Sequence, residues 1–385
     1  MSQSVQITPA ALEWAIEEDG MPVPELADRL GVPEAVLEAW TVGEELPTKG
    51  QFSRLAEVLR RPRALFFLPS APSSSGVPAD LRGAPGLLGR ALTPEERRLI
   101  RLTMRLQSEA SRLFQQQGER AVMMPSAGLE DSQEAAGGRL RAWLQVPVSI
   151  QTGWSTSYAA LRAWRQAVED ARVIVLQLQL GARGIRGFSL MDDFAPLIAV
   201  NTGYNAAARV FSIFHELAHL IARSEAACAG FYAPSGGGTS LALERWCERV
   251  ASAALLPGTA FESAVGDRDG RVSSFDDARR LADRFNVSIR AIAIRAIRMG
   301  LADPDFYAVV EENAVTVDRA TRAGGGGGRV TAQKRFDEYG RRLPGAVLRA
   351  AANREIPLRD AVDLMGITTS QVADLERLVT SGDAL

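Results

Sequence analysis

The chain has 385 residues, of which 46% are hydrophobic, and it carries 44 basic against 46 acidic side chains. This is enough apolar material for two or three compact units, which excludes a disordered or fibrous protein. The near balance of charge gives no molecule-wide signal for binding to nucleic acid or to membranes, so any such binding must be local.

The cysteine content and the lengths of the apolar segments indicate in which cellular compartment the protein is expected. Two cysteines, Cys228 and Cys247, are too few for a disulfide framework and favour a reducing environment. They do not form a C-x-x-C pair, and Cys247 is expected to pack in a core. The first residues lack the pattern of a signal peptide, and no run approaches about eighteen uninterrupted apolar residues. We therefore expect a cytoplasmic protein that binds no membrane.

Residues 1–69 predict a small helical domain. Four short helices are expected, the first with Leu12, Ala15 and Ile16 on one face and the others over residues 24–31, 32–40 and 51–61. The two middle helices meet at Gly31 with helix-turn-helix spacing, and the small side chain of Ala27 lets them approach closely. Pro, Ser and Gly then dominate residues 70–92, which predicts a linker.

Residues 93–310 predict the main domain. Thr93 is a helix N-cap followed by proline, and it opens a long amphipathic helix. Two β-branched runs, residues 173–180 and 195–201, flank a glycine-bearing stretch and are expected to be strands of a small sheet. Further helices are expected around Leu241 to Leu256, over Ser274 to Phe285, and over 287–301 with Ser288 as its cap.

Five consecutive glycines mark the end of this domain. They place a flexible linker at residues 311–330, and residues 331–385 are expected to form a helical C-terminal region that ends in two short helices about a Gly-Ile turn. The predicted fold class is therefore α+β and mostly α, with one small sheet in the main domain.

Both histidines of the chain lie in the segment "FSIFHELAHLIA", as His215 and His219, with Glu216 between them. A spacing of four places both imidazoles on one helix face, where they can bind one metal ion, and Glu216 can sit beside a water on that ion. Zinc suits two imidazoles and an open position. The alternative is a pair of structural histidines, which would need several hydrogen-bond partners to offset their burial.

A catalytic zinc site needs a third protein ligand, and no other histidine exists. The predicted helix over residues 241–257 offers Glu244 and Glu248 on one face. We expect Glu244 to bind the metal. Glu248, one turn further on, is expected to accept a hydrogen bond from a ligating imidazole and fix its tautomer. The alternative for both glutamates is a solvated helix face.

These roles define a hydrolytic mechanism in which zinc acidifies a water and Glu216 transfers its proton to the leaving amine of a peptide. The group that stabilises the oxyanion stays open among four residues, which are Tyr158, Tyr204, Tyr232 and Arg209.

The run at 195–201 precedes the histidine segment. It is either an exposed edge strand that pairs with a substrate peptide or an ordinary core strand.

The segments "PLIAVN", "RVFSIFHELAHLIAR" and "ERWCERVASAALLP" resemble the ImmA/IrrE family of HExxH metallopeptidases over residues 155–310. The N-terminal helices resemble the Xre-type helix-turn-helix domain that is often fused before it. The resemblance implies that His215, His219 and Glu244 bind metal and that Glu216 is the catalytic base. It also implies a partner, because members of the family cut a repressor or antitoxin-like protein, and some act as antitoxin-like partners of a toxin.

One residue departs from this family. Glu248 stands where the family usually has asparagine, and it adds a second negative charge near the metal. This charge favours tighter cation binding, admits Mn²⁺ as an alternative to Zn²⁺, or lowers the reactivity of the water by neutralising the ion.

The charge of the N-terminal domain gives weak support for DNA binding. Residues 1–69 hold six basic and eleven acidic side chains, and the expected recognition helix carries Glu34 and Glu38 with no Arg or Lys. Phosphate neutralisation drives most protein–DNA affinity, so holding a partner protein or forming a homodimer suits this domain at least as well. Residues 319–359 carry ten Arg or Lys and form either a solvated helix face or a contact for nucleic acid or an acidic protein.

Two functions follow from these features. The first is a zinc endopeptidase with a fused helix-turn-helix that cleaves a regulatory protein and so controls transcription or a stress response. The second is a non-proteolytic regulator, or the antitoxin of a toxin–antitoxin pair, that uses the peptidase fold to bind its partner. The substitution Glu216→Gln separates them, because it removes the base and leaves the metal ligands in place.

Overall fold

The computed structural model describes residues 4–72, 92–181, 185–229, 237–266, 270–318 and 331–381. Contacts within the chain divide it into two compact units, residues 1–102 and 103–385, each of which is described by itself. The division lies inside helix α5 (Pro94–Gln116), whereas the sequence analysis places a linker at residues 70–92.

Several sequence predictions fall outside the described residues. They are most of the predicted linkers, at residues 73–91 and 319–330, together with Tyr232 and the side chain of Cys228. Cys247 is described, and it is buried in the core as the sequence predicts.

The first unit is a bundle of short helices. They are α1 (Pro9–Asp19), α2 (Val23–Leu30), α3 (Glu34–Val42), α4 (Lys49–Val58) and the 3₁₀ helix η1 (Arg63–Phe67). Leu26, Leu37 and Trp40 from α2 and α3 are buried in one core with residues of the other helices. The turn between α2 and α3 depends on Gly31, whose φ of 71° lies in the left-handed region that favours glycine.

The second unit is built around a three-stranded sheet of β1 (Ile174–Leu178), β2 (Gly187–Leu190) and β3 (Leu197–Asn201). The strand order is β1-β3-β2, with β3 parallel to β1 and antiparallel to β2. Ile198 therefore lies between Val175 and Ser189 in register. The prediction of a mostly helical α+β fold with a small sheet is confirmed.

The position of β3 decides between the two alternatives for the run at 195–201. The run is a strand in the centre of the sheet, so it is the core strand and not an edge strand that could pair with a substrate peptide. The edge strand beside β3 is β2, which the sequence analysis did not predict as a strand. It lies in the glycine-bearing stretch between the two predicted strands. Its four residues are too short for a recognisable alternation, and its pairing with β3 is a tertiary contact.

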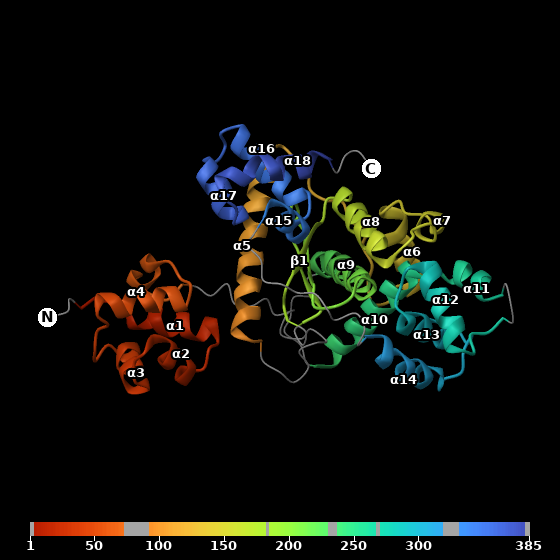
Figure 1. Ribbon diagram of the computed structural model, residues 1–385, viewed down its shortest axis with the longest axis horizontal. Helices are drawn as coiled ribbons and strands as arrows, with labels where there is room; N and C mark the ends of the chain where they lie inside the picture. The colour runs from red at the N-terminus through yellow and green to blue at the C-terminus, as the bar shows by residue number, and fades with distance from the viewer. Residues whose placement is uncertain are drawn as a thin grey trace. The chain divides into compact units, whose positions relative to one another are not determined.

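Helix α9 (Ala206–Ala229) packs on this sheet and is the central helix of the unit (Figure 1). It contacts β2 and β3 on one side, α8 (Ser157–Asp170) on another and α10 (Gly237–Leu255) on a third. The core between them contains large buried side chains from each element, including Trp164, Phe214 and Trp246. The helix with the histidine motif is therefore held on several sides by packed apolar residues.

The remaining helices of this part of the unit are α6 (Gln133–Trp143), α7 (Val148–Gln151), α11 (Gly258–Gly266), α12 (Phe275–Phe285), α13 (Ile289–Arg298) and α14 (Phe306–Asp318). Two N-caps expected from the sequence are present. Thr93 forms a reciprocal capping pair with Glu96 at the start of α5. Ser288 accepts the Ala291 N–H at the start of α13.

The C-terminal helices belong to the same unit as the sheet. They are α15 (Ala332–Tyr339), α16 (Arg342–Ala352), α17 (Leu358–Met365), the 3₁₀ helix η4 (Thr369–Gln371) and α18 (Val372–Ser381). The expected Gly-Ile turn is present at Gly366, in the left-handed region with φ of 60°. Helix α15 packs beside β1, so these helices cover one edge of the sheet. None of the described helices is long and apolar enough to cross a lipid bilayer.

Candidate metal centre

The histidine motif lies in the middle of α9, and its spacing of four residues brings the two imidazole rings close together. His215 Nε2 and His219 Nε2 are 3.2 Å apart, and the ring planes meet at 73°. One helical turn separates the two residues, so both rings project from the same face of α9. The edges that carry Nε2 therefore converge on one point outside the helix.

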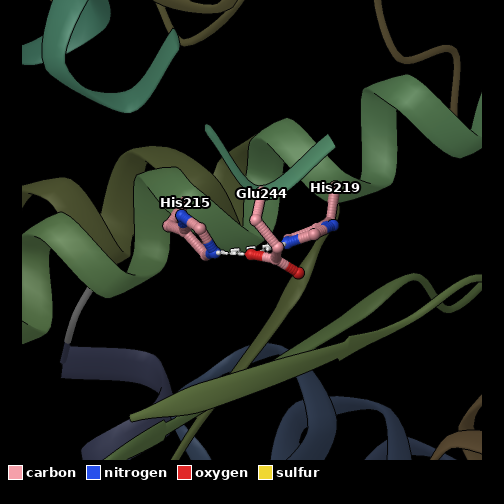
Figure 2. Close-up of side chains that lie close together, drawn as sticks. All are labelled: His215, His219 and Glu244. Carbon is pink, nitrogen blue, oxygen red and sulfur yellow. Dashed lines mark hydrogen bonds and ion pairs between the residues drawn. The ribbon is translucent and has the colours of Figure 1, made fainter. Parts of the chain in front are cut away.

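Helix α10 brings Glu244 to the same point. Its Oε2 lies 3.1 Å from His215 Nε2 and 3.3 Å from His219 Nε2 (Figure 2). Close packing of α10 on α6 fixes this position, because a Cβ at Gly137 of α6 would lie 2.7 Å from the backbone nitrogen of Ala254. Only a glycine permits this approach between the two helices.

The three ligand atoms fit a metal ion. Their separations of 3.1, 3.2 and 3.3 Å form a nearly equilateral triangle. Zinc bound at about 2.0–2.1 Å in a tetrahedron keeps neighbouring ligand atoms about 3.3 Å apart. All three side chains are mostly buried, and each offers one ligand atom within 4.8 Å of the others. Two imidazoles and a carboxylate are also the donor set that zinc accepts.

The electrostatics of the cluster favour a positive charge between the rings and the carboxylate. Burial alone would lower the pKa of His215, but the hydrogen bond to Glu244 and the charge of Glu216 raise it overall. Burial would raise the pKa of Glu244, yet the hydrogen bonds to both histidines lower it to about 2. The protein part of the site therefore carries an ionised carboxylate and attracts a cation.

Glu216 lies next to this cluster on the side of strand β2. It is 7% exposed, and its Oε1 would lie 3.4 Å from a Cβ built at Gly187. The same Cβ would lie 2.9 Å from the Ala199 carbonyl oxygen, so a larger residue does not fit between β3 and Glu216. Sequence reasoning missed Gly187, although a glycine inside a strand often marks such a close approach.

Glu248 is not where the sequence analysis expects it. Its carboxylate faces Arg298 of α13 at 3.8 Å and is 46% exposed, while its charge acts on His215 more weakly than those of Glu216 and Glu244. The buried Nδ1 of His219 has no hydrogen-bond partner within the part of the chain that the structure describes. The partner of Glu248 is thus an arginine on another helix, fifty residues further along the chain, and the sequence spacing on α10 could not reveal this.

Two of the suggested oxyanion partners face another region. Arg209 donates from Nη1 to Gln177 Oε1 at 2.7 Å, and its guanidinium lies 5.8 Å from the ring centre of Tyr158. His215 lies six positions after Arg209 on α9, which places the two residues about 120° apart around the helix. The guanidinium carbon of Arg186 lies 5.3 Å from the ring centre of Tyr204. Tyr158 and Arg209 thus belong to the side of α9 that faces α8 and β1.

Comparison with known proteins agrees with this site. Residues 168–296 match the family model of the IrrE N-terminal-like domain, a peptidase family. The match covers about a third of the chain, from the end of α8 to α13, and includes His215, Glu216, His219 and Glu244. A search of curated proteins finds no match. The matched segment is similar to metallopeptidases of the ImmA/IrrE type, a family that implies a bound metal ion, usually zinc.

Proposed function

We propose that this protein is a zinc-dependent endopeptidase that cleaves a regulatory partner protein, either a repressor or an antitoxin-like protein. The observation that carries the proposal is the triangle of ligand atoms from His215, His219 and Glu244, with sides of 3.1 to 3.3 Å. Its position inside a segment similar to ImmA/IrrE-type metallopeptidases supports the same reaction class.

Each residue has one task in this proposal. His215, His219 and Glu244 hold the ion, and the ion when bound supplies a Lewis acid that acidifies water and polarises a carbonyl. Glu216 accepts the proton of the attacking water and delivers it to the leaving amine. Its burial between α9 and Gly187 of β2 limits its motion and keeps the carboxylate beside the rings.

We assign the first unit to holding a protein partner or a second copy of the chain. The surface of α3 supports this role, because Glu34 and Glu38 are exposed there while Val42 is 65% exposed. An acidic helix is repelled by phosphates, so DNA reading is the weaker role. The small number of cysteines, two in the whole chain, is consistent with the reducing cytoplasm, the compartment we propose.

The experiment compares the wild-type protein with Glu216→Gln. Both are assayed on a proteome-derived peptide library read by mass spectrometry, with zinc or manganese supplied. We expect both to bind one ion per chain and only the wild type to cleave, with a rate at least about 100-fold above that of the variant. Equal cleavage by the two proteins, or no metal in either, would overturn the proposal.

A non-proteolytic regulator or antitoxin is the second candidate, and one observation favours it. The charge of Glu248 acts on His215 in addition to those of Glu216 and Glu244, and surplus negative charge weakens a metal ion as a Lewis acid. In this case Glu216→Gln would keep metal and would regulate its partner as well as the wild type does.

A further inference from the structure

A groove lies along α8 in the unit that carries the metal centre. It has a volume of about 1180 Å³ and runs from the α6–α7 segment to α15. Its floor consists of the small residues Ala159, Ala163 and Ala167, which follow one face of α8. From Tyr158 to Asp170 the groove follows α8 for about 18 Å, enough for an extended peptide of about six residues.

One end of the groove exposes large apolar side chains. Ile150 is 54% exposed and Tyr158 is 59% exposed, and both line it together with Trp154. The indole of Trp154 is held in place by an edge-to-face contact with the buried Trp164, with ring centres 5.2 Å apart. A rigid aromatic beside exposed apolar groups is the composition of a protein-binding hot spot.

Arg209 provides a fixed cation in the same groove. Gln177 and the ring of Tyr158 hold its guanidinium on two sides, and Gln177 itself donates to the Asp337 carbonyl oxygen at 3.1 Å. The buried Nε of Arg209 has no hydrogen-bond partner among the described residues. Burial lowers the pKa of Arg209, and the charge and hydrogen bond of Tyr158 oppose this effect. Because Arg209 also lines the groove, its guanidinium can bind a carboxylate of a ligand there.

The charges around the groove indicate the class of ligand. Arg162 is exposed on its wall, but so are Asp170 and Asp337. The buried pair Arg165 and Glu169 is already engaged with the backbone of the C-terminal helices. The exposed carboxylates repel a nucleic acid backbone, and charges of both signs along one groove suit a polypeptide.

We propose that this groove is a docking site for an extended segment of a partner protein that places an apolar side chain beside Ile150 and Tyr158 and a carboxylate at Arg209 and Arg162. Because Arg209 and His215 point in different directions from α9, this segment is held away from the metal centre. This inference rests on the proposed function in one respect, because it takes the docked partner to be the protein that is cleaved.

The test uses the full-length protein with Glu216→Gln, which keeps the groove and does not cut the probe. Random displayed peptides of about ten residues are selected on it, and the affinity of each enriched peptide is measured by fluorescence anisotropy. The same peptides are then measured on proteins that also carry Ile150→Asp or Arg162→Glu. Matched controls are Met123→Asp and Arg359→Glu, whose side chains are 84% and 88% exposed outside the groove.

We expect enriched peptides to combine an apolar residue with Asp or Glu and to lose at least about tenfold in affinity on both groove variants but not on the controls. Removal of metal with EDTA should leave this binding unchanged. Equal affinity for groove and control variants, or a selection without any peptide that depends on Ile150 and Arg162, would overturn the proposal. A failure of the proposed function would appear separately, as absent metal or absent cleavage in the wild-type protein.

Discussion

Two buried clusters of the second unit each pair a glutamate with basic groups, imidazoles in one and a guanidinium in the other, and they have different roles. In the metal centre, two imidazoles and a carboxylate point at one another, and the Nδ1 of His219 has no partner among the described residues. In the second cluster, Arg165 of α8 donates to the carbonyl oxygens of Asp337, Glu338 and Val175 at 2.6, 3.2 and 2.7 Å.

The backbone explains the difference. Glu169 pairs with Arg165 at 3.6 Å and accepts the Arg341 N–H at 3.0 Å, so the second cluster fastens α15 and α16 to α8 and β1. Arg165 Nε and Glu169 Oε1 have no hydrogen-bond partner among the described residues, but the other polar atoms of this pair bind backbone groups of several elements. Buried charges tied to the backbone in this way hold a fold together, whereas side chains whose ligand atoms converge on one point indicate a ligand.

The largest effect is expected from breaking the structural cluster. Arg165→Met leaves Glu169 buried without its counter-charge and removes three hydrogen bonds to carbonyl oxygens, so we expect a loss of about 3–5 kcal/mol in the free energy of unfolding. Urea denaturation measures this loss. The matched control is Arg162→Met, an exposed residue of the same helix. Similar stability of the two variants would contradict the structural role assigned to Arg165.

Breaking the metal centre should affect the ion more than the fold. Glu244→Gln removes one ligand charge, and we expect zinc affinity to fall by more than about 100-fold, which a competitive chelator titration measures. Glu248→Gln, on the same helix but facing Arg298, should keep its zinc. Loss of zinc from the second variant and not the first would exchange the roles assigned to the two glutamates.

Gly187 tests the geometry of the base. In Gly187→Ala the new methyl group lies 2.9 Å from the Ala199 carbonyl oxygen, so β2 and β3 must move apart, and the contact of Glu216 with β2, at 3.4 Å from the same methyl group, changes with them. We expect kcat to fall by about 10- to 100-fold with zinc retained. Gly138→Ala on α6, where no atom lies within 4 Å, is the control. A kcat equal to that of the control would show that Glu216 does not depend on this close approach.

A smaller, pH-dependent effect on stability is expected from Glu119, which pairs with Arg342 of α16. Burial would raise the pKa of Glu119, but the hydrogen bonds and charges of Arg342 and Arg172 lower it overall. Its contribution to stability is therefore present above the unfolded pKa of about 4.3 and is lost as the pH falls through the folded pKa. Glu119→Gln should remove about 1 kcal/mol near neutral pH and flatten the acid limb of the stability curve. Exposed Glu130→Gln should leave that curve unchanged.

The sequence predicts those parts of the molecule that local geometry controls. The spacing of His215 and His219 places their rings on one face in any helix, and the caps at Thr93 and Ser288 act within one turn. Glu244 could be predicted as the third ligand because the chain has no other histidine, and the structure places its Oε2 3.1 Å from His215 Nε2. The match to a peptidase family falls on this same part of the chain.

Contacts between distant elements could not be predicted in this way. Arg298 lies fifty residues beyond Glu248, and no local pattern joins them. Strand β2 becomes a strand only through its pairing with β3. Tyr158 and Arg209 were suggested as oxyanion partners from their residue types alone, whereas packing of α8 on α9 turns them to a different face.

The central claim is that two imidazoles and one carboxylate hold a single metal ion. The zinc K-edge X-ray absorption spectrum of the purified, stoichiometrically loaded protein tests it most directly. We predict a first shell of only nitrogen and oxygen at about 2.0–2.1 Å, with multiple scattering from two imidazoles that falls to one in His219→Ala. A shell that contains sulfur, or an imidazole signal that His219→Ala leaves unchanged, would contradict the account.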